Sequence, residues 1–181
     1  MRSDLVRGAK FPDLQLADHA GNPRSLALLA GEDPVLLNFY RGWWCPKEQA
    51  FFRELVAFQN EVEVAYTRMV SVSVDPPEVE SAFRAGLGAR WTFLSDQHRR
   101  YLDALELRET TDTMHEPYTP TVFVLEPDLT IASVYVGYWY WGRPTREELH
   151  RDLREVTHRV RDNWEPEHET ALARARRERA A

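Results

Sequence analysis

The sequence predicts a layered α/β protein with a central mixed β-sheet flanked by helices, and two patterns carry this prediction. An apolar run at residues 35–40 precedes a stretch of helical periodicity that begins at Pro46. Later in the chain, residues 121–136 have a hairpin pattern, which is followed by one more amphipathic stretch. Strands connected through helices run parallel and a hairpin runs antiparallel, so the expected sheet is mixed.

The individual elements follow from local patterns. Weak alternation at residues 11–18 and the turn residues Gly21 and Asn22 predict an N-terminal hairpin, while residues 25–30 fit either a helical turn or a second strand. Further strands are expected at residues 35–40, 69–74, 91–94, 121–125 and 131–136. Helices are expected to start at Pro46 and at Thr145. A third is expected over residues 78–85, ended by Gly86 and Gly88, and a fourth is expected to be capped by Asp96 and to reach about Leu105.

The last helix has the clearest start signal in the chain. Thr145 is expected as its N-cap, and Glu148 three residues later would complete a capping box. After Trp164 the composition becomes charged and rich in alanine. We therefore divide the chain into a domain of residues 1–164 and a charged C-terminal helix or tail of residues 165–181.

Composition and charge exclude several classes of function. The 181 residues are 43% hydrophobic and 29% charged, which is typical of one globular domain. The net charge of -6 argues against a nucleic-acid partner or an anionic membrane surface. No apolar run approaches the roughly 20 residues that span a bilayer, and the first residues lack the apolar core of a signal peptide. A single cysteine allows no internal disulfide, so we expect a reducing, cytoplasmic location.

That single cysteine, Cys45, lies where strand, turn and helix meet. Pro46 suits the first position of a helix, where a backbone N–H would have no partner. The free N–H groups and the helix dipole at that end favour a thiolate, which is the reactive form of cysteine. Cys45 is therefore a candidate nucleophile or redox centre, and the alternative is a small buried residue with no chemical role. No histidine has metal-ligand spacing with it, so we expect no metal and no other cofactor.

Several segments, taken in order, match a known family. They are residues 11–16, 21–23, 35–45, 71–78, 83–88, 93–96 and 119–124. Together they resemble the peroxiredoxin-like branch of the thioredoxin fold, the alkyl hydroperoxide reductase and thiol-specific antioxidant (AhpC/TSA) family. The resemblance implies a thioredoxin-like fold, with Cys45 as the residue that is oxidised. It also implies that Pro120 follows a cis peptide bond, which would place the backbone of Thr119 beside the sulfur.

The chain departs from that family at three positions. The best-known members have Thr or Ser three residues before the attacking cysteine, and here that residue is Gly42. They have an arginine near the start of the strand that corresponds to residues 122–125, and none lies there in this chain. A second family pattern, Arg-Gly-x-Trp-Cys-Pro-x-Cys, fits residues 41–48 better, but Glu48 replaces its resolving cysteine. A Cys-x-x-Cys disulfide therefore cannot form.

The resemblance implies that Cys45 acts alone. Its thiolate would attack a peroxide and become a sulfenic acid, and an external thiol such as thioredoxin or glutathione would resolve it through a mixed disulfide. Arg41 is the candidate for electrostatic support of this step; its alternative is a surface arginine stacked on Trp43 or Trp44. The helical pattern places Glu48 on the solvent side of its helix. A carboxylate close to the sulfur would disfavour the thiolate unless it points outward, and the alternative is that Glu48 serves as a proton acceptor.

The candidate substrate-binding residues are Trp43, Trp44, Thr119 and Pro120. Aromatic residues here and at residues 138–141 have a second interpretation, as core packing or a homodimer interface. His115 precedes Pro120 and either approaches the sulfur or lies exposed in a loop. Two other functions stay open: a non-catalytic binding or assembly module, and a monothiol protein that exchanges disulfides with glutathione.

Overall fold

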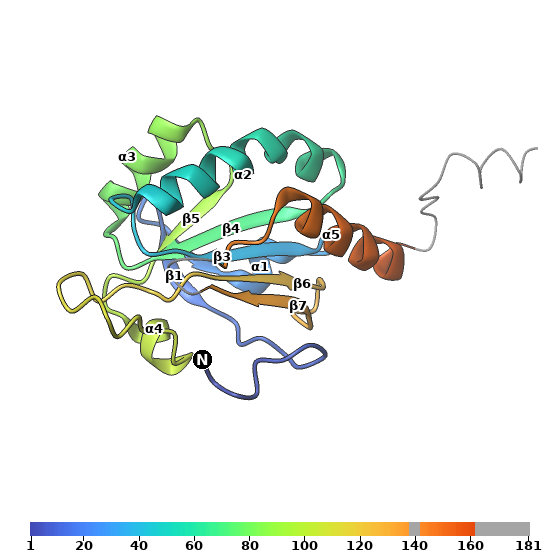
Figure 1. Cartoon of the computed structure of the whole chain (residues 1–181). Coiled ribbons are helices and arrows are strands. Elements are labelled where there is room, and N and C mark those ends of the chain that lie inside the picture. Colours follow the sequence, from blue (N-terminus) through green and yellow to red (C-terminus); the bar gives the residue numbers. More distant parts are fainter. Residues whose placement is uncertain (138–141, 162–181) are drawn as a thin grey trace, which may run out of the picture.

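A seven-stranded mixed sheet forms the centre of the computed structural model, which describes residues 1–137 and 142–161 (Figure 1). The strands are β1 (Gln15–Asp18), β2 (Pro23–Ser25), β3 (Val35–Phe39), β4 (Arg68–Ser73), β5 (Thr92–Ser95), β6 (Thr121–Leu125) and β7 (Ile131–Val136). Their order across the sheet is β2-β1-β5-β4-β3-β6-β7. The parallel pairs are β3 with β4 and β4 with β5, and the other pairs are antiparallel. The predicted mixed sheet is confirmed.

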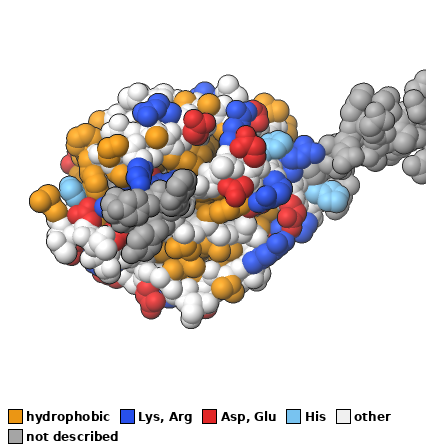
Figure 2. Space-filling view, in the orientation of Figure 1, with side chains coloured by type: hydrophobic (Ala, Val, Ile, Leu, Met, Phe, Trp, Pro, Cys, Tyr) orange, Lys and Arg blue, Asp and Glu red, His pale blue; other side chains and the backbone are white. Residues whose placement is uncertain are grey.

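Helices cover both faces of this sheet. They are α1 (Leu26–Ala30), α2 (Pro46–Val64), α3 (Pro77–Leu87), α4 (Arg100–Ala104) and α5 (Arg146–Val160). In Figure 1, α2, α3 and α5 lie on one side of the sheet, and α4 with the N-terminal segment lies on the other. Within the described part of the chain, none of these helices combines the length and the apolar character needed to cross a membrane. Acidic and basic side chains alternate over α5 on the face shown in Figure 2.

Strand β3 is buried on both faces, as its continuous apolar run predicts. Val35, Leu37 and Phe39 belong to the core on one side of the sheet, whereas Leu36 and Tyr40 belong to the core on the other side. This alternation follows from the two-residue period of a strand. The end of β3 is therefore packed between two cores, and the chain that leaves that end leads to Cys45.

The two ambiguous or weakly marked helix starts are settled by their caps. Ser25 ends β2 and also caps α1, because its side chain accepts the N–H of Leu28. The alternative at residues 25–30 therefore resolves as a helix. Asp96 accepts the backbone N–H groups of residues 100–102, as a capping side chain does. The helix itself starts at Arg100 with Arg99 as the N-cap residue, later than the expected cap at Asp96. The capping box of Thr145 and Glu148 is likewise confirmed at the start of α5.

Two expectations about the backbone are wrong. Gly86 lies inside α3, and Gly88 alone ends that helix in the left-handed conformation at φ 71°. The peptide bond between Thr119 and Pro120 is trans, as are all peptide bonds between described residues. The aromatic segment of residues 138–141 and the proposed domain boundary after residue 164 lie outside the described residues.

Candidate active site

Cys45 is the N-cap residue of α2, directly before Pro46 at the first helical position. Its side chain is 4% exposed. Its backbone N–H donates to the carbonyl of Gly42 at 3.2 Å, which closes the short turn after β3, and its carbonyl accepts the N–H of Gln49 at 3.0 Å. The thiol makes no capping hydrogen bond to the helix. The predicted position of the cysteine at a helix start is therefore confirmed, with the sulfur shielded from solvent.

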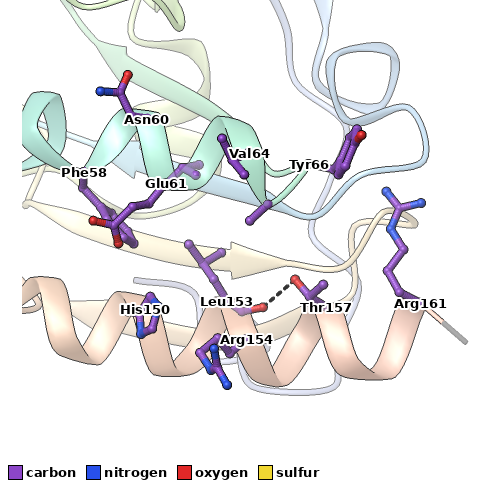
Figure 3. A pocket seen from close by; sticks show the side chains of 12 residues that line it. Phe58, Asn60, Glu61, Val64, Tyr66, His150, Leu153, Arg154, Thr157 and Arg161 are labelled. Carbon is purple, nitrogen blue, oxygen red and sulfur yellow. Dashed lines mark hydrogen bonds between the residues drawn. The ribbon is translucent and has the colours of Figure 1, made fainter. Parts of the chain in front are cut away.

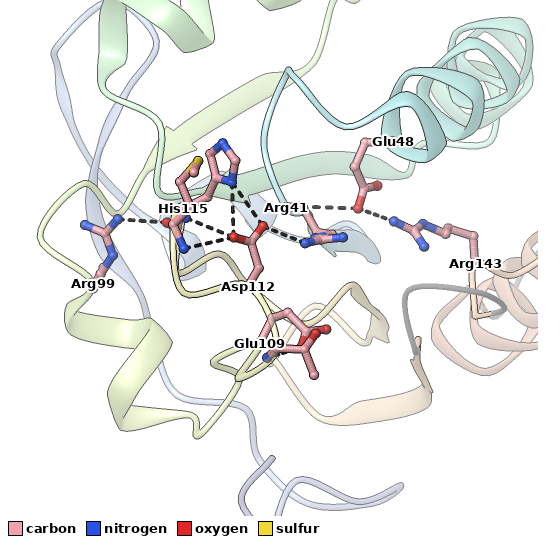
Figure 4. A network of polar contacts seen from close by, with 9 residues as sticks. Arg41, Glu48, Arg99, Glu109, Asp112, His115 and Arg143 are labelled. Carbon is pink, nitrogen blue, oxygen red and sulfur yellow. Dashed lines mark hydrogen bonds and ion pairs between the residues drawn. The ribbon is translucent and has the colours of Figure 1, made fainter.

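Glu48 does not lie on the solvent side of α2, so that expectation is wrong. The side chain is 1% exposed and forms an ion pair with Arg143, which is 12% exposed (Figure 4). Glu48 Oε1 also accepts the backbone N–H of Arg41 at 3.2 Å. A buried carboxylate is tolerated when it is paired and hydrogen-bonded. Its partner comes from the segment before α5, far along the chain, and helical periodicity cannot reveal such a partner.

Burial and the pairing with Arg143 act in opposite directions on the pKa of Glu48. Burial raises the pKa of Glu48, while the charge and the hydrogen bond of Arg143 act in the opposite direction. Glu48 lies in the first turn of α2, three residues after Cys45. Arg143 supplies the positive charge that pairs with this buried carboxylate.

Several buried polar atoms around this pair have no hydrogen-bond partner among the described residues. They are Nε and Nη1 of Arg143, Nε of Arg41 and Oε2 of Glu48. Buried polar atoms in folded proteins are nearly always hydrogen-bonded, so such a group needs an explanation. Three donors and one acceptor on these three side chains match the hydrogen-bonding needs of a small polar ligand.

Arg41 matches part of the stacking alternative expected for it, but it does not lie at the surface. Its guanidinium lies over the ring of Trp44, 5.1 Å from the centroid, as the stacking alternative predicts. Yet the side chain is only 11% exposed, and its Nη2 donates to Asp112 Oδ2 at 2.8 Å. It is therefore a nearly buried, paired cation rather than a surface arginine. Its role in catalysis stays a prediction.

The two tryptophans before Cys45 have different surroundings. Trp43 is 50% exposed, while its backbone is held by Asp75 Oδ2 at 3.0 Å and by the Gln49 side chain at 2.8 Å. Trp44 stacks on His115 with 3.9 Å between ring centroids. His115 Nδ1 in turn lies 3.1 Å from Asp112. The His115 side chain is still 40% exposed, so the expected loop histidine is partly exposed and also packs against Trp44.

Gly42 explains one departure from the family pattern. Its φ is +144°, a conformation that residues with a side chain rarely adopt. A Cβ at this position would lie 2.6 Å from Nε1 of Trp44 and 3.1 Å from Asp75 Oδ2. The indole therefore occupies the space that the usual Thr or Ser would need.

Thr119 and Pro120 lie at the same edge of the sheet, because Thr121 at the start of β6 pairs with Phe39 at the end of β3. The N–H of Thr119 donates to Leu107 at 2.6 Å, and the carbonyl of Pro120 accepts a backbone N–H at 2.6 Å. The N–H of Thr119 is thus occupied within the chain and does not offer itself to a substrate backbone. A substrate-binding role for the two residues stays a prediction.

Two grooves border α2. One, of about 930 Å³, lies between the C-terminal half of α2 and α5 and is lined by Phe58, Leu153 and others (Figure 3). Phe58 is 13 residues beyond Cys45, so at 1.5 Å per residue this groove lies roughly 20 Å away from the sulfur. The other, of about 760 Å³, lies between α2 and α3 and is lined by Trp43 and Phe83. It adjoins the candidate site.

Among the described residues, no three His, Cys, Asp or Glu side chains form a metal-binding group.

The site and the sheet define a class of protein before any comparison is made. A lone cysteine that starts a helix after a central strand of a mixed sheet is the arrangement of thiol redox proteins. A family model described as the AhpC/TSA family matches residues 7–134, which is most of the chain. The chain therefore belongs to the AhpC/TSA family.

Individual relatives agree with this assignment. A curated protein of Mycobacterium tuberculosis named as a peroxiredoxin is 28% identical over 133 residues, covering 72% of this chain and 84% of that protein. The crystal structure of peroxidoxin BcpB from Mycobacterium tuberculosis has a TM-score of 0.72 at 20% identity, covering 87% of this chain and 99% of that chain. Reduced Prx3 from Vibrio vulnificus in complex with hydrogen peroxide has a TM-score of 0.74 at 16% identity, covering 82% and 99%. These likenesses confirm the thioredoxin-like fold.

Proposed function

We propose that this peroxiredoxin-like chain is a single-cysteine thiol peroxidase in which Cys45 reduces a peroxide. The observation that carries the proposal is the group of unpaired buried donors and one acceptor on Arg41, Glu48 and Arg143. Glu48 lies in the first turn of the helix that Cys45 starts. Membership of the AhpC/TSA family supports the same chemistry. Reduced Prx3 from Vibrio vulnificus was crystallised in complex with hydrogen peroxide, which makes a peroxide the natural ligand to test on this chain.

In the proposed reaction, the thiolate sulfur of Cys45 attacks one oxygen of the peroxide. A sulfur–oxygen bond forms, the O–O bond breaks, and the second oxygen leaves as alkoxide or hydroxide and takes up a proton. Arg143 and Arg41 would donate their unpaired N–H groups to the peroxide oxygens as negative charge develops on the leaving oxygen. Arg143 would thereby serve in place of the arginine that is missing before residues 122–125.

An external thiol would then regenerate Cys45, because the chain has no second cysteine. The thiol attacks the sulfenic sulfur, releases water and leaves a mixed disulfide, and a second thiol completes the reduction. A structural neighbour, the yeast mitochondrial 1-Cys peroxiredoxin, is described as being resolved through glutathione and thioredoxin systems; it has a TM-score of 0.69 at 14% identity. Those two thiols are the reductants we propose for this chain.

The test mixes the reduced protein with equimolar hydrogen peroxide and follows tryptophan fluorescence by stopped flow. Because Trp43 and Trp44 precede Cys45 directly, oxidation of the sulfur should change the signal. Intact mass after trapping with dimedone would identify a sulfenic acid, which can form at only one cysteine. We expect a rate far above that of a free thiol, lost in Cys45→Ser. A free-thiol rate would overturn the peroxidase proposal, and rapid adduct formation with oxidised glutathione would then indicate a monothiol exchange protein.

A further inference from the structure

The segment between α4 and β6 folds into an arm that reaches the candidate site. Arg108 and Tyr118 form an isolated β-bridge, and the N–H of Glu109 donates to the carbonyl of Pro117 at 2.9 Å. These contacts close the base of the arm. Asp112 lies within the arm and is the residue through which it contacts Arg41 (Figure 4).

Asp112 is held in place by several donors. Oδ1 accepts the backbone N–H of Met114 at 3.1 Å and that of His115 at 3.0 Å. The ring Nδ1 of His115 lies 3.2 and 3.1 Å from the two carboxylate oxygens. Burial opposes ionisation, but these hydrogen bonds outweigh it, and the pKa of Asp112 is lowered. Oδ2 pairs with Arg41, and the hydrogen bonds to residues 114 and 115 fix the orientation of the carboxylate that makes this pair.

The remaining contacts of Arg41 close a ring of four side chains. Arg41 lies over Trp44, Trp44 stacks on His115 at an interplanar angle of 20°, and His115 returns to Asp112. The guanidinium is thus fixed from two directions, by an ion pair and by a ring face. Its Nε remains buried and unpaired among the described residues.

We propose that Asp112 is a positioning residue: it orients Arg41 so that the unpaired Nε–H of Arg41 meets the peroxide bound at Cys45. This inference rests on the proposed peroxidase function. Two carboxylates then have parallel tasks, because Glu48 holds Arg143 while Asp112 holds Arg41. The alternative is that Asp112 only stabilises the turn of its own arm through the backbone N–H groups of residues 114 and 115.

A double-mutant cycle separates these two roles. Asp112→Asn keeps an oxygen for the backbone N–H groups but removes the charge that Arg41 pairs with. We expect it to lower the second-order rate constant for hydrogen peroxide by about tenfold, a coupling in the range measured for interacting side chains. In an Arg41→Met background the same change should have almost no further effect, because Asp112 would have nothing left to orient. Asp112→Glu should recover part of the rate.

Asp103→Asn is the matched control. Asp103 Oδ1 lies 2.7 Å from Arg108 Nη2 at the base of the same arm, and the Asp103 side chain is 61% exposed. Loss of this ion pair perturbs the arm without changing the contacts of Arg41. We expect an unchanged peroxide rate. If Asp112→Asn proves unfolded by circular dichroism, Asp112→Ser replaces it, because a serine hydroxyl can still accept from the turn.

Two results would overturn the inference: a wild-type rate in Asp112→Asn, or an equal loss with and without Arg41. Either result leaves the peroxidase proposal intact as long as Cys45→Ser abolishes peroxide consumption. Conversely, full consumption by Cys45→Ser would overturn the proposed function itself, whatever the behaviour of Asp112.

Discussion

Replacing Arg143 with methionine would leave a carboxylate without its counter-ion inside the protein. Glu48 is 1% exposed and forms its ion pair with Arg143 between α2 and the segment before α5. Its other hydrogen bond comes from the neutral backbone N–H of Arg41. The charge of Arg41, which is paired with Asp112, lowers the pKa of Glu48 less than Arg143 does. We therefore expect Arg143→Met to destabilise the folded state as well as to change the reactivity of Cys45.

The expected loss in the free energy of unfolding at neutral pH is about 3–5 kcal/mol, the range for removing one partner of a buried ion pair. Burial already raises the pKa of Glu48 from its ordinary value of 4.5, and removing Arg143 should raise it further. A carboxyl with a raised folded-state pKa favours folding below its unfolded-state pKa, and that contribution is lost as pH rises through the folded-state pKa. The destabilisation of Arg143→Met should therefore shrink as the pH falls toward about 5.

Urea denaturation followed by circular dichroism at both pH values measures this effect. Arg146→Met is the matched control, since Arg146 pairs with Glu61 on the surface at 41% and 49% exposure. That exposed pair should contribute at most about 1 kcal/mol. Glu48→Gln combined with Arg143→Met should recover much of the loss, because position 48 then carries no buried charge that lacks its partner. A cost for Arg143→Met equal to that of Arg146→Met, or a cost independent of pH, would refute the reasoning.

Three further predictions concern single residues. Gly42→Ser should cost about 1–3 kcal/mol of stability in urea denaturation, because residue 42 has a positive φ and a Cβ there would contact Trp44. The variant should not reduce peroxide faster than the wild type, and a faster, stable variant would contradict this. Glu80 is fully buried, accepts the hydroxyl of Tyr40, and has a pKa raised by burial, so it contributes stability at low pH that is lost as pH rises through its folded-state pKa. Glu80→Gln should flatten that decline in urea midpoints measured against pH, and an unchanged slope would count against it. Thr145→Ala should cost about 1 kcal/mol through loss of the N-cap of α5, and an unchanged midpoint of unfolding would contradict the cap.

Most of the fold could be predicted because its signals are local. The run at residues 35–40 has the continuous apolar character of a doubly covered strand, and Pro46 marks the helix that follows. The capping box at Thr145 needs only two residues three apart. By contrast, Gly86 does not end α3 as expected, because a glycine inside a helix costs only about 1 kcal/mol, which the tertiary contacts of that helix can offset.

The candidate site is only partly predictable, because its partners are distant in the sequence. The position of Cys45 follows from its immediate neighbours. The burial of Glu48 depends on Arg143, 95 residues further along, and the orientation of Arg41 depends on Asp112, 71 residues further along. A single sequence contains no local signal for either pairing. The only available hint is that a glutamate three residues after the cysteine must lie near it on a helix.

The departures from the family pattern are connected with one another through Trp44. Its indole fills the space beside Gly42, which excludes the usual Thr or Ser, and the same indole supports the guanidinium of Arg41. Restoring a hydroxyl at position 42 would therefore displace the ring that holds Arg41. Changing the residue at position 42 thus also changes the support of Arg41. On the proposed mechanism, stabilisation of a leaving oxygen requires positive charge and N–H groups at the right place, whichever segment supplies them. Arginines held by Glu48 and Asp112 can meet that requirement without the arginine that other members carry at the start of β6.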